Sequence, residues 1–437
     1  MLAFLHLRRR SDLLRHPFFA VAGRRFSQST SIPKKLQRVR DHGFDNVMEV
    51  EKKVRRALSL QSMLLSQPSA SLPFARLDAL ARRYLNFVPD EVGNFLIKHH
   101  YVFHVFDHPV QRLLWVRLTP RAEARLLQES DALLSMLPDA VRRLRKLLLL
   151  ATPSLRIRLE HIRIARYDLG LPDDFEQSVV LAHPSFFRLV VSSDCPDDPR
   201  AKYVEFVDAP NDATDDDAAD LRVCAIERKR EREYRERGTD AEDSRFSFLI
   251  NFPPGFKIGK YYRIAVWKWQ RLPYWSPYED VSGYDLRSLE AKRRMEKRMV
   301  ATIHELLSLT VEKRLTMERI AHFRQAIGLP NKMKEFLLQH QGIFYISTRG
   351  NQGKLHTVFL REAYRKGELL KPNELYLARR ELGEMLLPSS KNANLDRMMT
   401  TIGRGRDGLR NRVAAGDLRS EAEDSGCDSS VESQFLD

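Results

Sequence analysis

Cysteine is scarce in this chain of 437 residues. Cys195, Cys224 and Cys427 are its only cysteines, and no two of them form a CxxC pair. This spacing excludes a zinc ribbon or a disulfide scaffold and favours a reducing compartment. Long apolar runs are missing too, because the longest, Leu147 to Ala151, is far shorter than the ~20 residues that cross a bilayer. The length nevertheless allows two or three domains with a substantial core.

Catalytic signatures are also missing. The chain has no P-loop, no G-x-S-x-G and no H-E-x-x-H. Gly403 and Gly405 flank Arg404 in the C-terminal tail, without the strand and helix of a dinucleotide loop. The carboxylates show no apolar-flanked pair suited to acid/base work. We therefore expect a protein that is not an enzyme and that carries no cofactor or metal.

Acidic residues are outnumbered by basic ones. Lys and Arg total 73 against 58 Asp and Glu, which gives a net charge of +15, and the isoelectric point is about 9.7. A hydrophobic fraction of 43% is that of a folded protein, while the mean hydropathy of -0.43 indicates a polar surface. Such a field favours polyanions, either nucleic acid or an anionic membrane surface.

Residues 1–26 have the composition of an organellar transit peptide. Six arginines stand against one acid, Asp12, and a segment rich in Ser and Thr follows. Arg24 lies three residues before Ser27, which is the spacing of a mitochondrial cut after Phe26. The alternative is a disordered basic arm. Removal of these residues would lower the net charge from +15 to +10, so targeting does not account for the charge.

Three segments of the chain share one pattern. They read LDALARRYLNFVPDEVGNFLIKHHYVF from Leu77, LEHIRIARYDLGLPDDFEQSVVLAHPSFF from Leu159 and MERIAHFRQAIGLPNKMKEFLLQHQGIF from Met317. In each, an apolar-periodic segment leads to a proline, then to a histidine, then to a phenylalanine four residues later. The three sets are Pro89, His99 and Phe103; Pro172, His183 and Phe187; Pro330, His340 and Phe344.

The pattern predicts a helix, a proline-marked turn, a second helix and a β-hairpin. Val92, Phe95 and Leu96 give the second helix one buried face. The closing strands are predicted in LLWVRL from Leu113, YVEFV from Tyr203 and HTVFL from His356. Two helices and a hairpin form a winged-helix-like unit, so we predict a helix-rich α/β (α+β) fold with repeats at about 70–130, 152–210 and 312–370.

The repeated histidines could be metal ligands or structural residues. Each lies at a predicted helix end beside an apolar strand, and the shared offset occurs within separate units. A capping or buried role explains that offset better than a shared ion does.

The chain between the second and third repeats departs from the pattern. An acid-rich stretch spans 194–220, either as a solvated insertion or as a regulatory acidic mimic. IERKREREYRERG from Ile226 predicts a charged helix with i,i+4 pairs, and residues 285–310 predict a long amphipathic helix with a basic outer face. NELYLARRELGEML from Asn373 predicts another helix, and we expect the tail at 391–437 to be disordered.

The central segment, 246–280, is basic and aromatic. Its core, FPPGFKIGKYYRIAVWKWQRLPYWSPYED from Phe252, holds three of the four tryptophans and has no acid before Glu279. Alternation of side chains over 266–271 predicts a β-strand with Trp267 and Trp269 on one face. These tryptophans either stack on bases or form core that joins the segment to the repeats, and the sequence leaves both open.

Interleaved cations and aromatic rings suit single-stranded nucleic acid. Lys and Arg neutralise phosphates and release counterions, and rings stack on unpaired bases. The candidate RNA contacts in the central segment are Lys257, Lys260, Tyr261, Tyr262, Arg263, Trp267, Lys268, Trp269, Arg271, Tyr274 and Trp275. Two further basic surfaces are expected, at Arg142, Arg143, Arg145 and Lys146, and at Lys292, Arg293, Arg294, Lys297 and Arg298.

Several longer motifs resemble those of one family. They are RVRDHGFDNVMEVEKKVR from Arg38, FPPGF from Phe252, WQRLPYWSPYED from Trp269, ELLSLTVEKRLTMERIAHFRQAIGLP from Glu305 and VFLREAY from Val358. Together they resemble the plant organelle RNA recognition domain, typified by the "What's this factor" proteins, over residues 33–387. The acidic insertion and the position of Trp275 look individual to this chain.

The resemblance implies a nuclear-encoded plant protein that enters mitochondria or chloroplasts, binds group II intron RNA and promotes splicing without catalysis. The arginine-rich N-terminus favours mitochondria. Other splicing factors or a maturase are possible partners. The resemblance supplies no residue-level RNA contacts. A rival from another class is a protein-interaction scaffold in organellar ribosome assembly or maturase recruitment, and a nuclease is the least favoured reading.

Overall fold

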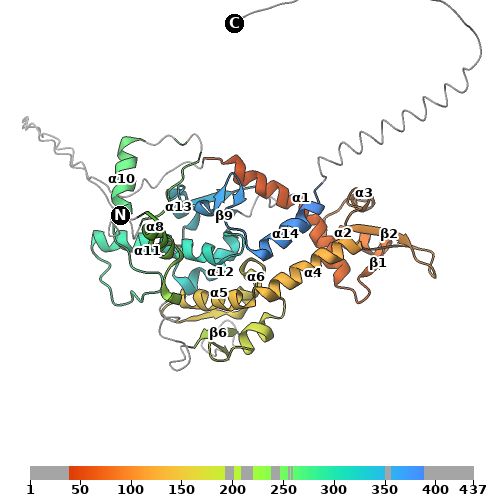
Figure 1. The fold of residues 1–437 in the computed structure, drawn as a ribbon, viewed down its shortest axis with the longest axis horizontal. Coiled ribbons are helices and arrows are strands. Elements are labelled where there is room, and N and C mark those ends of the chain that lie inside the picture. The colour runs from red at the N-terminus through yellow and green to blue at the C-terminus, as the bar shows by residue number, and fades with distance from the viewer. Residues whose placement is uncertain are drawn as a thin grey trace, which may run out of the picture. The chain divides into compact units, whose positions relative to one another are not determined.

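A computed structural model describes residues 39–191, 201–207, 220–237, 247–253, 256, 259–349 and 356–387 (Figure 1). The chain forms two compact units. Unit 1 contains residues up to Val50 and residues 129–377, and unit 2 contains residues 51–128 and those from Ala378 onward. Helices α1 (His42–Leu65), α4 (Pro120–Ser135) and α14 (Glu374–Met385) contribute residues to both. None of the helices in the described ranges is long and apolar enough to cross a membrane.

Three repeats have the same order of elements: a short strand, a helix, a second helical segment and a hairpin. The first, in unit 2, has β1 (Ser71–Pro73), α2 (Phe74–Leu85), α3 (Glu91–Lys98), β2 (Phe103–Asp107) and β3 (Leu114–Leu118). The second, in unit 1, has β4 (Arg156–Arg158), α6 (Leu159–Leu169), the π-helix η1 (Glu176–Leu181), β5 (Phe187–Val191) and β6 (Lys202–Phe206). The third, also in unit 1, has β7 (Arg314–Thr316), α12 (Met317–Ile327), α13 (Met333–Gln339), β8 (Phe344–Ser347) and β9 (Thr357–Leu360).

Each repeat builds one antiparallel three-stranded sheet, in the orders β1-β3-β2, β4-β6-β5 and β7-β9-β8. The predicted α+β class is confirmed, and so is the order of helix, helix and hairpin within each repeat. The likeness to winged-helix proteins stays a prediction. Sequence reasoning missed the first strand of every sheet because three residues are too few to show a period of two.

The helix ends explain why the pattern recurs. Asn86, Gly170 and Gly328 cap α2, α6 and α12 in the left-handed conformation, with φ of 55°, 65° and 69°. Glycine and asparagine adopt this conformation at low cost, which ends the helix and reverses the chain before the proline.

The repeated histidines have structural surroundings: the side chains of His99 and His340 are buried, and Nδ1 of His183 lies 2.9 Å from the Val179 carbonyl oxygen. The carbonyl oxygens of His99, His183 and His340 each accept hydrogen bonds from two backbone N–H groups just before and at the start of the following strand, at 2.9 to 3.1 Å. The strand-opening residues Phe103, Phe187 and Phe344 are buried in all three repeats. Across the described residues, no group of three His, Cys, Asp or Glu side chains could hold a metal ion.

The core of unit 1 centres on two helices, α5 (Leu137–Leu149) and α11 (Leu289–Leu309). Their buried apolar residues pack with the second and third repeats. A short helix, η2 (Arg361–Ala363), and a two-stranded sheet of β10 (Tyr364–Arg365) and β11 (Glu368–Leu369) follow the third repeat. A separate core in unit 2 joins the first repeat to Val54, Ala57, Leu60 and Leu64 of α1.

Predicted helices are confirmed as α8 (Ala225–Arg237), α11 and α14. Arg235 and Glu231 form an i,i+4 ion pair on α8, as predicted for this charged helix. The predicted transit peptide at 1–26, most of the acidic insertion and the tail at 391–437 lie outside the described residues.

The predicted central β-strand is wrong. Its residues belong to a helix, α10 (Lys260–Arg271). Ala265 and Trp269 are buried four residues apart, with Tyr262 half-buried on the same side, and this spacing is helical. An alternation seen over only six residues did not distinguish the two periods.

Candidate nucleic-acid interface

Helix α10 has a buried face and an exposed face. At 100° per residue, positions 260, 264, 267 and 271 fall within one narrow stripe opposite Trp269. The exposed residues are Lys260, Tyr261, Arg263, Ile264, Trp267, Lys268 and Arg271. The helix contains four cations and no acid, so every charged side chain on its exposed face is positive.

Two aromatic side chains stand among these cations. Tyr261 is 85% exposed and Trp267 is 54% exposed. The Arg271 guanidinium lies 3.9 Å from the centre of the Trp267 ring, in a cation–π contact. Since both aromatic side chains bring a flat π-surface to a positive face, the helix presents the two groups that single-stranded nucleic acid requires.

The opposite face anchors the helix to unit 1. Trp269 is 3% exposed, with its ring centre 5.7 Å from that of Phe248 and 5.1 Å from that of His340. The Gln270 side chain accepts from the Phe248 N–H at 2.8 Å and donates to the Phe248 carbonyl at 2.7 Å. Trp269 is therefore a packing residue, whereas Trp267 is exposed and its contact with RNA stays a prediction.

Lys297, expected on a basic surface of α11, is buried instead. Its amine donates to the carbonyl of Gln270 at 2.7 Å and to that of Leu272, so it caps the C-terminal end of α10. Burial lowers the pKa of Lys297 to about 7. The expectation of a surface cation is wrong here because the last carbonyls of α10 need a donor.

The segment after α10 is fixed by side chains from α11 and α8. Arg298 donates to the carbonyls of Ser276 at 3.1 Å, Pro277 at 3.1 Å and Glu279 at 2.8 Å. Tyr274 is buried, and its hydroxyl donates to Glu227 at 2.9 Å. Trp275 is half-buried, with its ring centre 4.9 Å from that of Tyr284. Arg298 and Tyr274 thus hold the segment in place.

Glu305 of α11 is the centre of a buried network. Its carboxylate accepts from Lys146 at 3.0 Å, from the Tyr278 hydroxyl at 2.7 Å and from the backbone N–H of Ala225 at 2.6 Å. Burial, and secondarily the Glu305 charge, raises the pKa of Tyr278. Lys146 is buried, so the surface expectation is wrong for this residue as well.

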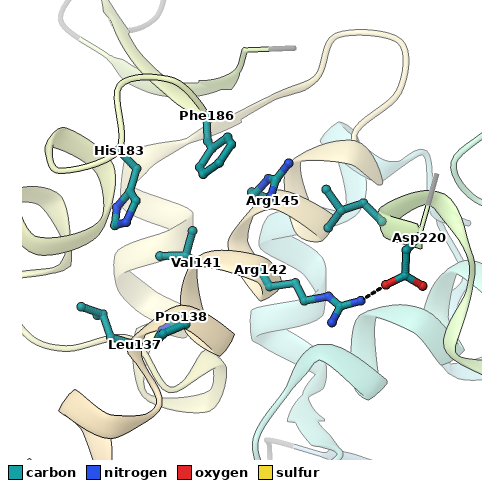
Figure 2. Close-up of a pocket in the computed structure, with 9 residues that line it drawn as sticks. Leu137, Pro138, Val141, Arg142, Arg145, His183, Phe186 and Asp220 are labelled. Carbon is teal, nitrogen blue, oxygen red and sulfur yellow. Dashed lines mark hydrogen bonds and ion pairs between the residues drawn. The ribbon is translucent and has the colours of Figure 1, made fainter. Parts of the chain in front are cut away.

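The remaining α5 arginines make contacts within unit 1. Arg142 and Arg145 line a hollow of about 370 Å³. Figure 2 shows Arg142 directed toward Asp220, with which it forms an ion pair. The Arg145 guanidinium lies 3.9 Å from the centre of the Phe186 ring. Arg143 donates to the Leu169 carbonyl at 2.6 Å. Each of these three guanidinium groups therefore already contacts another part of unit 1.

The predicted site residues divide by location. Lys260, Tyr261, Arg263, Trp267, Lys268 and Arg271 share the exposed face of α10, while Tyr262 lies half-buried against Phe252 and Phe256. On α11, Lys292 is exposed, Arg293 is half-buried and Arg294 pairs with Glu290 at 2.6 Å. Lys257 lies outside the described residues. Ile264 completes the exposed stripe and was missed, although a helical period would have placed it there.

These features define a positively charged, aromatic surface suited to a polyanion, in an α+β chain with three repeats. The sequence matches the family described as the plant organelle RNA recognition domain over residues 39–391, and the chain belongs to this family.

The chain is 61% identical over 386 residues to the protein ROOT PRIMORDIUM DEFECTIVE 1 of Arabidopsis thaliana, covering 88% of this chain and 90% of that protein. It is 31% identical to the chloroplastic WHAT'S THIS FACTOR 1 homolog of Oryza sativa subsp. japonica, covering 79% of this chain and 64% of that protein. It is 28% identical to the mitochondrial WHAT'S THIS FACTOR 9 of Arabidopsis thaliana, covering 81% of this chain and 87% of that protein. No solved structure matches the chain.

Proposed function

We propose that this chain is an RNA-binding protein of plant mitochondria that promotes splicing of group II introns and does no chemistry itself. The observation that carries the proposal is the exposed face of α10, with four cations, two aromatic side chains and no acid. Membership of the plant organelle RNA recognition family supports the RNA ligand. The names of its relatives include both chloroplastic and mitochondrial proteins and so leave the organelle open. The arginine-rich residues 1–26 and the Arg24 to Ser27 spacing support mitochondria.

In the proposed mechanism, α10 grips a single-stranded part of the intron. Lys260, Arg263, Lys268 and Arg271 neutralise phosphates, and Tyr261 and Trp267 stack on unpaired bases. Each stacked base contributes about 1–3 kcal/mol. Neutralisation lets compact RNA segments approach one another, and the intron's own active site performs the transesterification.

The first experiment measures RNA binding by gel mobility over a salt series. The variant Lys268→Ala with Arg271→Ala removes two cations from α10. The slope of log K against log salt is negative, and each lost phosphate contact should reduce its magnitude by about 0.7. We therefore expect the slope to become less negative by about 1.4, together with weaker binding.

A matched control also removes two cations. Arg235 and Arg380 each pair with a carboxylate four residues away, Glu231 at 2.5 Å and Glu384 at 2.8 Å. The variant Arg235→Ala with Arg380→Ala should therefore keep the affinity nearly unchanged. Equal losses in both variants would mean that net charge alone is at work, and no loss in the α10 variant would refute the assignment.

The biological part of the proposal needs RNA from the organelle. RNA recovered with the tagged protein from isolated mitochondria should, when sequenced, be enriched in group II intron transcripts. Loss of the protein should leave those introns unspliced. Weak binding that is indifferent to the RNA offered would favour the interaction scaffold. Cleavage of labelled RNA in the presence of magnesium would refute the absence of catalysis.

A further inference from the structure

The sheet of the first repeat has one apolar face and one aromatic face. Phe103, Val116 and Leu118 point into the core of unit 2. The register pairs His104 with Arg117 and Phe106 with Trp115, so these four side chains share the opposite face. We call these four residues the outer face of the first repeat. Arg117 and His104 are exposed there, and Phe106 and Trp115 are half-buried.

The side chains of this outer face form a platform. The His104 and Phe106 rings are nearly parallel, at 14°, with centres 5.8 Å apart. Arg117 lies 5.0 Å from the centre of the Phe106 ring and donates from Nε to His104 Nδ1 at 3.4 Å. The neighbouring β1 strand adds Ser71 and Pro73, which pair with Arg117 and Trp115. No carboxylate belongs to these six positions.

The third repeat shows what the same face can hold. Its register places Tyr345 opposite Phe359, at the positions equivalent to His104 and Arg117. There the face is covered by Phe44 of α1, whose ring is stacked on Tyr345 at 4.9 Å. The Arg361 guanidinium lies 5.3 Å from the Phe44 ring centre and 5.6 Å from that of Tyr345. A planar ring beside a guanidinium therefore fits this face of the fold.

The second repeat has an outer face of different chemistry. Arg188 and Glu205, equivalent to His104 and Arg117, form an ion pair at 2.8 Å. A carboxylate at this position disfavours phosphate. Only the first of the three repeats combines an uncovered outer face, aromatic side chains and positive charge without a carboxylate within the described residues.

We propose that the outer face of the first repeat is a second RNA-binding surface, which stacks an unpaired base on His104 and Phe106 while Arg117 contacts the adjoining phosphate. It rests on the proposed function but is independent of α10. Charge complementarity selects RNA as the occupant, because the four residues of this face provide a cation, an exposed imidazole and two half-buried aromatic rings, and no acid. The stack of Phe44 on Tyr345 is the intramolecular counterpart of the proposed base.

The test uses the full chain and a single-stranded oligouridylate of about 12 nucleotides. This length is within the range of about 4–16 nucleotides that one single-strand-binding fold covers. Phe106→Leu keeps an apolar side chain and removes the ring, so the fold should survive. We expect binding to weaken about tenfold. Tyr203→Leu removes an aromatic side chain from the outer face of the second repeat and is the matched control, with an expected change below about twofold. Unchanged thermal unfolding would confirm that both variants fold.

The result separates this surface from the proposed function. If Lys268→Ala with Arg271→Ala weakens binding and Phe106→Leu does not, the second surface is refuted and α10 stands. If neither variant weakens binding, RNA binding by both surfaces is refuted. Photocrosslinking of a 5-bromouridine oligonucleotide gives a second readout. Crosslinks within residues 103–118 support the proposal, whereas crosslinks confined to α10 overturn it.

Discussion

Replacement of Glu305 tests the scaffold that positions α10. This carboxylate is 1% exposed and accepts from three donors on separate segments: Lys146, Tyr278 and the Ala225 N–H. Breaking a buried ion pair costs about 3–5 kcal/mol. The two remaining donors would lose their acceptor at about 1–3 kcal/mol each. We therefore expect Glu305→Ala to lower the free energy of unfolding of unit 1 by about 5 kcal/mol or more, comparable to the stability of many domains.

The assay is urea unfolding followed by tryptophan fluorescence. A Trp115→Phe background leaves Trp267, Trp269 and Trp275, all in unit 1, so the signal reports that unit alone. Lys146→Met should cost less than Glu305→Ala, because Glu305 would keep Tyr278 and the Ala225 N–H as donors.

The control is another glutamate of the same helix. Glu290 is exposed and pairs with Arg294 at 2.6 Å, an i,i+4 surface pair. Such pairs contribute less than about 0.5 kcal/mol, so Glu290→Ala should barely move the urea midpoint. If Glu305→Ala and Glu290→Ala gave the same midpoint, the network would not stabilise unit 1 and the reasoning would be refuted.

Three further predictions concern stability and the interface. Burial lowers the folded-state pKa of Lys297 from 10.5 to about 7 and that of Lys313 to about 8, so the unfolded state binds more protons. Stability should therefore rise by up to ~1.4 kcal/mol per pH unit for each lysine, from about pH 7 for Lys297 and from about pH 8 for Lys313, up to about pH 10. Urea titrations at several pH values should show that Lys297→Met flattens this rise. Gly170→Ala should destabilise unit 1 more than Gly328→Ala does. Both glycines have positive φ, which costs alanine about 1 kcal/mol, but a Cβ at Gly170 would also meet Arg143 at 2.6 Å and Val311 at 2.8 Å, whereas a Cβ at Gly328 meets nothing within 4 Å. Equal urea midpoints for the two variants would contradict this. Trp267→Ala should weaken binding of single-stranded RNA about tenfold and leave the salt slope unchanged, because it removes stacking and no cation; a changed slope in the gel-mobility series would contradict it.

Local patterns predicted the repeats because each repeat is built from local signals. Apolar residues at helical spacing, Gly or Asn at the helix end and a proline after it all act within a few residues, so they are readable from one sequence. The hairpins followed from β-rich runs, and His99, His183 and His340 had the same structural role in all three repeats.

Burial of the cations could not be predicted in the same way. Lys146 and Lys297 stand in basic runs that look like solvated faces, yet Lys146 meets Glu305, 159 residues away. Lys297 meets the end of α10, a helix whose residue pattern predicts a strand. Such partners depend on how distant segments pack, and one sequence without its fold carries no signal for them.

Several of the motifs that carry the resemblance meet one another in contacts within unit 1. Arg361 of VFLREAY pairs with Asp41 of the N-terminal motif at 2.7 Å. Tyr278 of WQRLPYWSPYED donates to Glu305, which opens the motif ELLSLT. By contrast, Lys260, Tyr261 and Arg263 of the exposed face of α10 fall between two motifs. Trp267 and Lys268 also lie outside these motifs, whereas Arg271 lies within WQRLPYWSPYED, so the exposed face of α10 is built mainly from residues that the quoted motifs do not contain.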